Sequence, residues 1–243
     1  MRGWTSTAVC AVAVSVASVV PSTSALAAQT QEEIEVGPTP QPTFGYESAR
    51  GVEREVHAAI LAKDHPETRD RHIDRAVELG RGFVASSPDD PDAHYWLAVS
   101  LGLDTEYSGA LAKLTTGKEC YEATARTLEL DPDHAGAHEL LGRIHAGVMR
   151  LPWLVRKLGA SLGMNDALGQ ASWETAESHL RRAAELDRDA IAPRLALGKL
   201  LDELDRPDQA LDWFEEARRI EPANDLDRAM VAEADSLLSL SPS

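Results

Sequence analysis

The spacing of the residues that close helices constrains this chain more than any other feature. Three prolines and one arginine each follow a segment with the residues of a helix end: Pro88, Pro132, Arg188 and Pro222. The interval from Arg188 to Pro222 is 34 residues, the length of one helix-turn-helix repeat. This period predicts an all-α solenoid, in which antiparallel helix pairs stack and each pair contacts its neighbours.

The last full repeat follows the tetratricopeptide pattern, which is W-x2-L-G-x2-Y, then A-x3-F, then P. Arg194 stands in the Trp position and is its departure from the pattern. Small residues at such positions let two helices approach closely, while Leu and Phe fill the space beside them. The matching residues are Leu197, Gly198, Leu201, Ala210, Phe214 and Pro222.

Earlier helix pairs follow the pattern with longer intervals. Pro132 to Arg188 spans 56 residues, 22 more than one repeat, and Pro88 to Pro132 spans 44, 10 more. We therefore expect a tetratricopeptide-type solenoid over 46–243 with a helical insertion at about 146–171. A first helix at 47–62 precedes a second that holds Ala76 and Gly80, and a capping helix is expected at about 225–240. The other slot residues are His94, Leu97, Ala98, Cys120, Thr124, His138, Leu141, Gly142, Ala176 and Leu180.

The N-terminus has the pattern of a secretory signal peptide. Arg2 precedes an apolar stretch from Ala8 to Val20, and small residues lead to Ala25-Leu26-Ala27, so cleavage is expected near Ala27. A membrane anchor is the alternative, but the apolar stretch is shorter than the roughly 20 residues that span a bilayer. Residues 28–45 are rich in proline and predict a disordered linker. We expect an exported protein, periplasmic or secreted.

Charge and cysteine content exclude several function classes. The formal net charge is −16, which argues against nucleic acid as a partner. Loss of the signal peptide would remove Cys10 and leave Cys120, so an intramolecular disulfide is not expected. Cys120 occupies a small-residue slot, where a buried small hydrophobe is expected rather than a reactive thiol.

Two patterns point weakly to an enzyme or a metal. Residues 159–163 match the G-x-S-x-G string around Ser161, but a nucleophile elbow needs a preceding strand, and the expected structure there is helical. Histidines His134, His138 and His145 are dense, yet packing in repeat slots explains them, and Gly142 stands where H-E-x-x-H needs its second His. We therefore expect a non-enzymatic protein without cofactor or metal.

The insertion carries an unusual charge pattern. No Asp or Glu occurs from Leu140 to Asn165, where four basic residues, Arg143, Arg150, Arg156 and Lys157, lie among apolar ones. One interpretation is a basic amphipathic contact for an acidic partner or anionic lipid. The other is a helix that packs over the solenoid while its cations extend into solvent.

Several segments resemble the regulator of microtubule dynamics family. The resemblance spans roughly 94–217 and implies a tetratricopeptide bundle with binding or adaptor work. Eukaryotic members of that family are linked to microtubules, which an exported chain would not meet, so the chain resembles an exported bacterial relative. The segments are Ala93 to Ala98, Thr116 to Glu119, Leu140 to Arg143, Leu151 to Trp153 with Arg156 and Lys157, and the helix that begins at Ala176.

The leading functional hypothesis is a scaffold or adaptor that binds a protein or peptide on the concave face of the first helices. In similar tetratricopeptide domains that face would include Tyr95, Glu139, Arg143, Leu195 and Lys199. Arg143 and Lys199 could hold a carboxylate between them.

The alternative hypothesis is a carrier of a lipid or other apolar ligand, held between the insertion and the solenoid. Trp153 would line the wall, and Arg156 and Lys157 would meet a head group.

Overall fold

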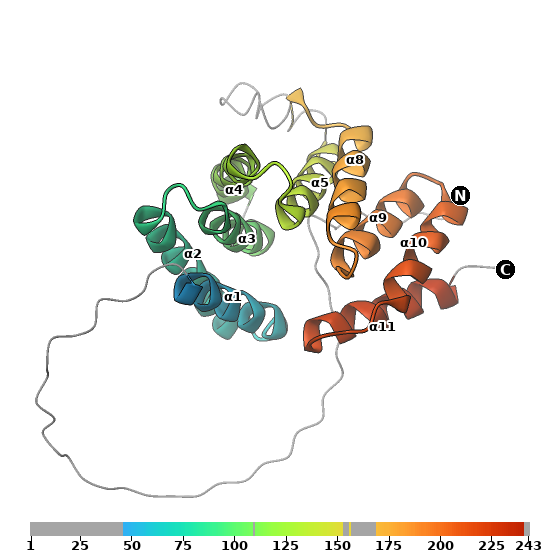
Figure 1. Cartoon of the computed structure of the whole chain (residues 1–243), viewed down its shortest axis with the longest axis horizontal. Coiled ribbons are helices and arrows are strands. Elements are labelled where there is room, and N and C mark those ends of the chain that lie inside the picture. The colour runs from blue at the N-terminus through green and yellow to red at the C-terminus, as the bar shows by residue number, and fades with distance from the viewer. Residues whose placement is uncertain (1–45, 109, 153–155, 157–168, 241–243) are drawn as a thin grey trace, which may run out of the picture.

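The computed structural model describes residues 46–108, 110–152, 156 and 169–240 (Figure 1). Within these ranges the regular structure is α-helical, as predicted. The helices are α1 (Tyr46–Leu61), α2 (Pro66–Ser86), α3 (Pro91–Tyr107), α4 (Ala110–Leu130), α5 (Ala135–Arg150), α8 (Trp173–Leu186), α9 (Ala192–Glu203), α10 (Pro207–Arg219) and α11 (Asp225–Leu240).

The helices pack in consecutive antiparallel pairs. Helix α1 pairs with α2, α3 with α4, α5 with α8, and α9 with α10, while α2–α3, α4–α5 and α8–α9 contacts join neighbouring pairs. Figure 1 shows the pairs following one another around an arch, with α1 and α11 as its two ends. This arrangement confirms the predicted solenoid, and α11 covers the stretch expected to form a capping helix.

Proline and short polar side chains set where the helices begin. Pro66, Pro91 and Pro207 each stand in the first turn of a helix, where the missing N–H costs no hydrogen bond. The carboxylate of Asp90 accepts a hydrogen bond from the backbone N–H of Asp92 at 3.0 Å. Ser172 caps α8 in the same way, through the N–H of Thr175. These starts are therefore determined by local sequence.

Close contacts at the small-residue slots hold each pair together. A methyl group added at Gly142 would lie 2.7 Å from Cγ of Leu180, and one at Gly198 would lie 2.4 Å from the ring of Phe214. At the equivalent place in the α3–α4 pair, Sγ of Cys120 donates to the carbonyl of Ala98 at 3.2 Å. Cys120 is buried, as the sequence predicted. Helices cannot approach this closely when larger residues intervene.

The Trp-slot residues tie α3, α5 and α9 to the turns before them. The Nε2 atom of His94 lies 2.8 Å from the carbonyl oxygen of Pro88, and that of His138 lies 2.9 Å from the carbonyl oxygen of Pro132. A carbonyl oxygen only accepts, so both imidazoles donate from Nε2. We call these side chains the junction anchors.

Arg194 is the junction anchor of the last repeat. Its Nη1 donates to the carbonyls of Asp187 and Ala190 at 3.1 and 2.6 Å, and its Nη2 donates to that of Ala184 at 3.2 Å. Arg194 thus replaces the histidine of the earlier repeats but keeps its role of binding the turn before the helix.

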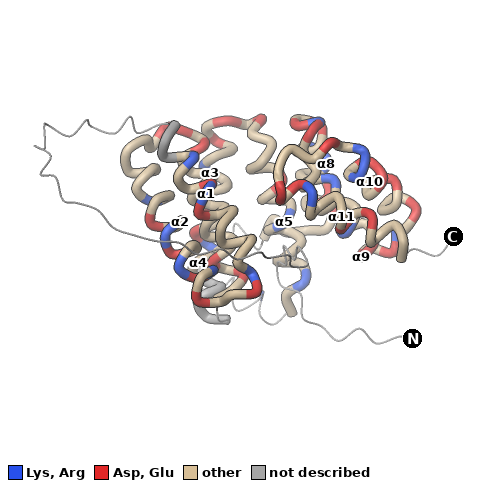
Figure 2. The backbone as a smooth tube through the Cα atoms, turned by 90° about the horizontal axis from the view of Figure 1, so that it is seen from below, with Lys and Arg blue, Asp and Glu red and all other residues tan. Residues whose placement is uncertain are grey.

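The acidic residues are spread over the solenoid rather than gathered in one segment (Figure 2). None of the helices in the described ranges combines the length and apolar character that a bilayer crossing requires.

Candidate partner-binding surface

Tyr95 on α3 and two residues of α5 form a cluster with Asp92, which we call the inner-face cluster: Asp92, Tyr95, Glu139 and Arg143. Nη1 of Arg143 donates to Oε1 of Glu139 at 2.9 Å, one turn apart on α5. Asp92 lies one turn before Tyr95 on α3, and its carboxylate is 3.1 Å from Nε2 of His134. The structure therefore brings together three of the predicted residues, Tyr95, Glu139 and Arg143, and adds Asp92.

The Tyr95 ring crosses the junction between α3 and α5. Its centroid lies 4.6 Å from that of His134. A methyl group on Gly136 would come within 2.6 to 2.7 Å of the ring and its hydroxyl oxygen. Gly136 is thus required for this contact, because any larger residue there would displace the ring.

Burial, followed by the negative charge of Glu139, Asp92 and Glu53, raises the pKa of the Tyr95 hydroxyl, which Arg143 opposes. Tyr95 keeps its proton at ordinary pH, as an unperturbed tyrosine also does, and can donate a hydrogen bond. Three carboxylates against one guanidinium give the surroundings of this ring a negative charge. Asp92 and Glu53 were not predicted from the sequence, although the i, i+3 spacing of Asp92 and Tyr95 could have indicated the first.

Leu195 does not belong to the surface, which corrects the prediction for this residue. Its exposed fraction is 4% and it lies in the core cluster of the last repeats, which also includes Ala234 of α11. Lys199 lies nearer the surface, but its Nζ is 2.5 Å from Oε1 of Glu233 on α11. Helix α11 packs on both α9 and α10, so it covers the part of the inner face that α9 was expected to offer.

The basic residues at the insertion are partly neutralised where the structure describes them. Arg150, at the end of α5, contacts both carboxylate oxygens of Glu203 on α9 at 2.6 to 3.1 Å. Its guanidinium also lies 5.9 Å from the ring centroid of Trp173. Nη1 of Arg156 is 3.3 Å from Sδ of Met149. Trp153, Lys157 and the Ser161 string lie outside the described residues.

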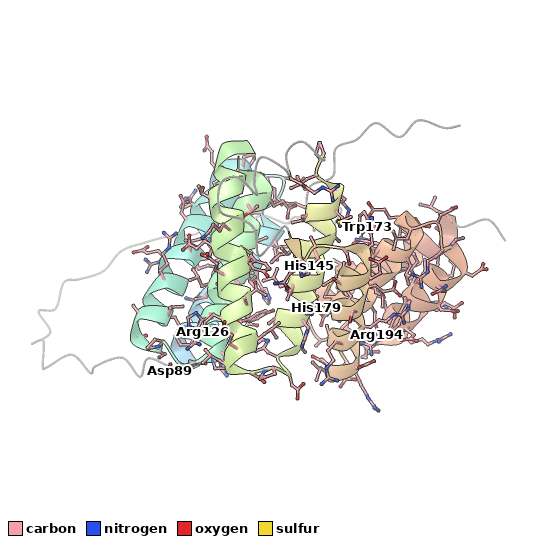
Figure 3. The ribbon with its side chains drawn as sticks, turned by 90° about the horizontal axis from the view of Figure 1, so that it is seen from above. Asp89, Arg126, His145, Trp173, His179 and Arg194 are labelled. Atoms are coloured by element: carbon pink, nitrogen blue, oxygen red, sulfur yellow. The ribbon has the colours of Figure 1, made fainter. Side chains whose placement is uncertain are left out.

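Three histidine rings form a row between α5 and α8. His138 and His179 approach through their Nδ1 atoms at 2.9 Å, and the rings of His145 and His179 stack at a centroid distance of 5.7 Å. Figure 3 labels His145 and His179. Because Nε2 of His138 donates to Pro132, its Nδ1 accepts from His179 when both rings are neutral. His145 is 1% exposed, and its Nδ1 has no hydrogen-bond partner among the described residues.

The surroundings of His179 and His145 favour their neutral forms. Burial, followed by the charges of His138 and His145, lowers the pKa of His179 to about 4. Burial also lowers the pKa of His145. Within the described ranges, no group of three or more His, Cys, Asp or Glu side chains is arranged to hold a metal ion.

The helix pairs, the close contacts at their small residues and the inner face together define a tetratricopeptide-type helical repeat protein. A solved structure of a thermophilic TPR protein from Thermus thermophilus matches 79% of this chain and 100% of its own length, with a TM-score of 0.50 and 18% sequence identity. At this identity the likeness concerns the fold.

The comparison with protein families assigns the chain more narrowly than the repeat class does. The family model described as regulator of microtubule dynamics protein 1-3 matches residues 47–241, and the chain belongs to this family. Regulator of microtubule dynamics protein 1 of Rattus norvegicus is 24% identical over 182 residues, which cover 74% of this chain and 58% of that protein. Protein 3 of Bos taurus is 28% identical over 150 residues, which cover 61% of this chain and 31% of that protein. The chain therefore spans less than two thirds of these relatives.

Proposed function

We propose that this protein is a non-enzymatic scaffold that binds a basic segment of a protein partner on the inner face of α3 and α5. The observation that carries this proposal is the inner-face cluster. It places the partly buried ring of Tyr95 beside an excess of carboxylates. Helical repeats commonly bind extended segments on such concave surfaces.

The charges favour a basic segment over the carboxylate expected from sequence. Arg143 is bound to Glu139 and Lys199 is bound to Glu233, so a carboxylate placed between the two cations would compete with existing ion pairs. A Lys or Arg side chain would instead meet the exposed carboxylate of Asp92, within the net negative charge around Tyr95, and pack its aliphatic stem on the Tyr95 ring.

Peptide display provides the test, because it works when the partner is unidentified. Random peptides selected on the full chain should be enriched in Lys and Arg, and their affinity should fall at least about tenfold with Asp92→Asn or Tyr95→Ala. Asp212→Asn, a substitution of an acid on α10, is the matched control and should leave the affinity unchanged. Selection of acidic peptides, or binding that ignores Asp92→Asn, would refute the proposal.

We also propose that the chain is exported after cleavage near Ala27. The basic, apolar and small-residue segments of 1–27 support this. Regulation of microtubules, which the relatives' name states, is accordingly not proposed for this protein. N-terminal sequencing of the protein from the exported fraction should begin near Ala28, whereas a full-length chain confined to the cytosol would contradict export.

A further inference from the structure

A cavity of about 300 Å³ lies where α8, the start of α9 and α10 meet. It is separate from the inner-face cluster and uses none of its residues. Three guanidinium groups line it, in a chain whose formal net charge is −16. The lining residues are Arg181, Ala184, Glu185, Arg188, Arg194, Trp213 and Glu216.

Two of these arginines are the positions at which this repeat junction differs from the others. Arg188 stands where the other junctions have Pro88 and Pro132, and Arg194 replaces a histidine anchor. Anchoring needs no cation, since the imidazole of His138 already binds the carbonyl of Pro132. Both replacements nevertheless line the same cavity. Arg194 anchors the junction through three bonds, whereas Arg188 makes none in the described ranges, so anchoring does not explain the cation at 188.

Arg194 holds its charge in a fixed position within the cavity wall. The residue is 8% exposed, and its guanidinium makes three hydrogen bonds to backbone carbonyls. A guanidinium has five N–H donors. Its Nε lies 3.6 Å from Glu216, and the second N–H of Nη2 has no acceptor in the part of the chain that the structure describes. Such a rigid group loses little conformational entropy on binding a ligand.

Arg188 and Trp213 complete the cavity. Arg188 is exposed, and it has no hydrogen bond or ion pair within the described ranges. Trp213 is partly buried, and the guanidinium of Arg181 lies 5.4 Å from its ring centroid while pairing with Glu177 at 2.8 Å. The indole of Trp213 therefore forms an apolar wall in the same cavity as the guanidinium of Arg188, which is unpaired within those ranges.

The balance of charge selects the class of anion. Arg181 is paired with Glu177 and Glu185 with Arg182, both partners lying outside the lining. Arg188 and Arg194 against Glu216 then leave one net positive charge in the cavity. A monoanion neutralises it, whereas a phosphate dianion would meet repulsion from two nearby carboxylates. The planar carboxylate also matches the donor geometry of a guanidinium.

We propose that this cavity binds a free carboxylate between Arg188 and Arg194, with the ligand's hydrocarbon part against Trp213. The chemistry is shared by two sources, a small amino-acid derivative and the C-terminus of a peptide. N-acetyl-leucine and a tetrapeptide that ends in leucine serve as probes for the two sources. Tighter binding of the tetrapeptide would identify a peptide terminus, and equal affinity would identify a small carboxylate.

Binding is followed on the intact chain by NMR, through the arginine Nε–H and tryptophan indole signals. We expect a Kd on the order of 1 mM for N-acetyl-leucine, at least about tenfold weaker binding for N-acetyl-leucinamide, and weaker binding for inorganic phosphate. Arg188→Gln should weaken carboxylate binding at least about tenfold. Arg219→Gln, which removes an exposed cation of α10, should not.

Because Arg188 is exposed and makes no contact through its charge in the described ranges, Arg188→Gln should keep the thermal unfolding midpoint. Equal affinity for the acid and the amide, full affinity in Arg188→Gln, or tighter binding of phosphate would each overturn the proposal.

Discussion

The backbone of Gly198 on α9 lies against the ring of Phe214 on α10, so that a methyl group on Gly198 would lie 2.4 Å from Cε1 of the ring. Both residues lie in the core of the last repeats, where Phe214 is 3% exposed. The contact sets the Phe214 ring directly against the backbone of α9, which lets α9 and α10 approach closely. It is the structural reason for the Gly and Phe positions of the repeat pattern.

Gly198→Ala should therefore destabilise the protein by about 1–3 kcal/mol, because Phe214 or a helix must shift. Urea unfolding followed by circular dichroism measures the change. Gly82→Ala on α2 is the matched control, since a methyl group there meets no atom within 4 Å. The control should gain about 0.5–1 kcal/mol from helix propensity. A neutral Gly198→Ala would show that the contact is not tight.

Asp205→Gly should stabilise the turn between α9 and α10. Asp205 has φ of 59°, a left-handed conformation that favours glycine. The N–H of Arg206 bonds to the carbonyl of Leu201 at 3.0 Å, and that of Asp205 to Asp202 at 3.1 Å, which is a Schellman motif. We expect a gain of about 0.5–1 kcal/mol in the free energy of unfolding. Asp202→Gly, inside α9, should instead lose a similar amount.

Acidification should destabilise the α5–α8 pair through His179. The folded state lowers the pKa of His179 to about 4 from its ordinary 6.5. Between these values the unfolded chain binds a proton and the folded chain does not. Stability is therefore retained above pH 6.5 and falls as pH drops toward 4, by roughly 1–3 kcal/mol.

Urea titrations at pH 7.5 and pH 5 measure this loss. His179→Gln, whose amide can still donate to His138, should show a smaller difference between the two pH values. An unchanged difference would assign the effect to other groups.

Removal of residues 225–243 should cause aggregation. Helix α11 packs on α9 and α10, and its loss would expose part of a core that includes Leu195. End repeats of solenoids need such caps for solubility. Light scattering of the purified proteins provides the measurement, with removal of 241–243 as the control. A soluble truncated protein of equal stability would contradict a capping role for α11.

Local pattern was enough to predict the helix pairs, because slot spacing and first-turn prolines act within one repeat. It placed the final helix at about 225–240, where α11 lies. It was wrong about Leu195, because the spacing within α9 cannot reveal that a later helix covers this face. The role of Arg194 was not predicted for a similar reason. A motif specifies the residue type at a position, whereas anchoring depends on which backbone carbonyls the guanidinium can reach in the folded chain.

The inner face was predicted in part for a related reason. Tyr95, Glu139 and Arg143 share a surface because the repeat geometry places them there. Asp92 lies three residues before Tyr95 on the same helix, a spacing that could have indicated it. Glu53 lies on α1 and acts on Tyr95 through the packing of α1 against α3, which the sequence of either helix alone does not specify.

The junction anchors imply that the solenoid is not equally cohesive along its length. The α2–α3 and α4–α5 junctions each carry one bond from an imidazole, whereas Arg194 makes three at the α8–α9 junction. Repeat arrays open at their weakest interfaces. Under native conditions, hydrogen exchange should divide the chain between α4 and α5 before α8 and α9 separate, so the last two repeats would open as one cooperative unit.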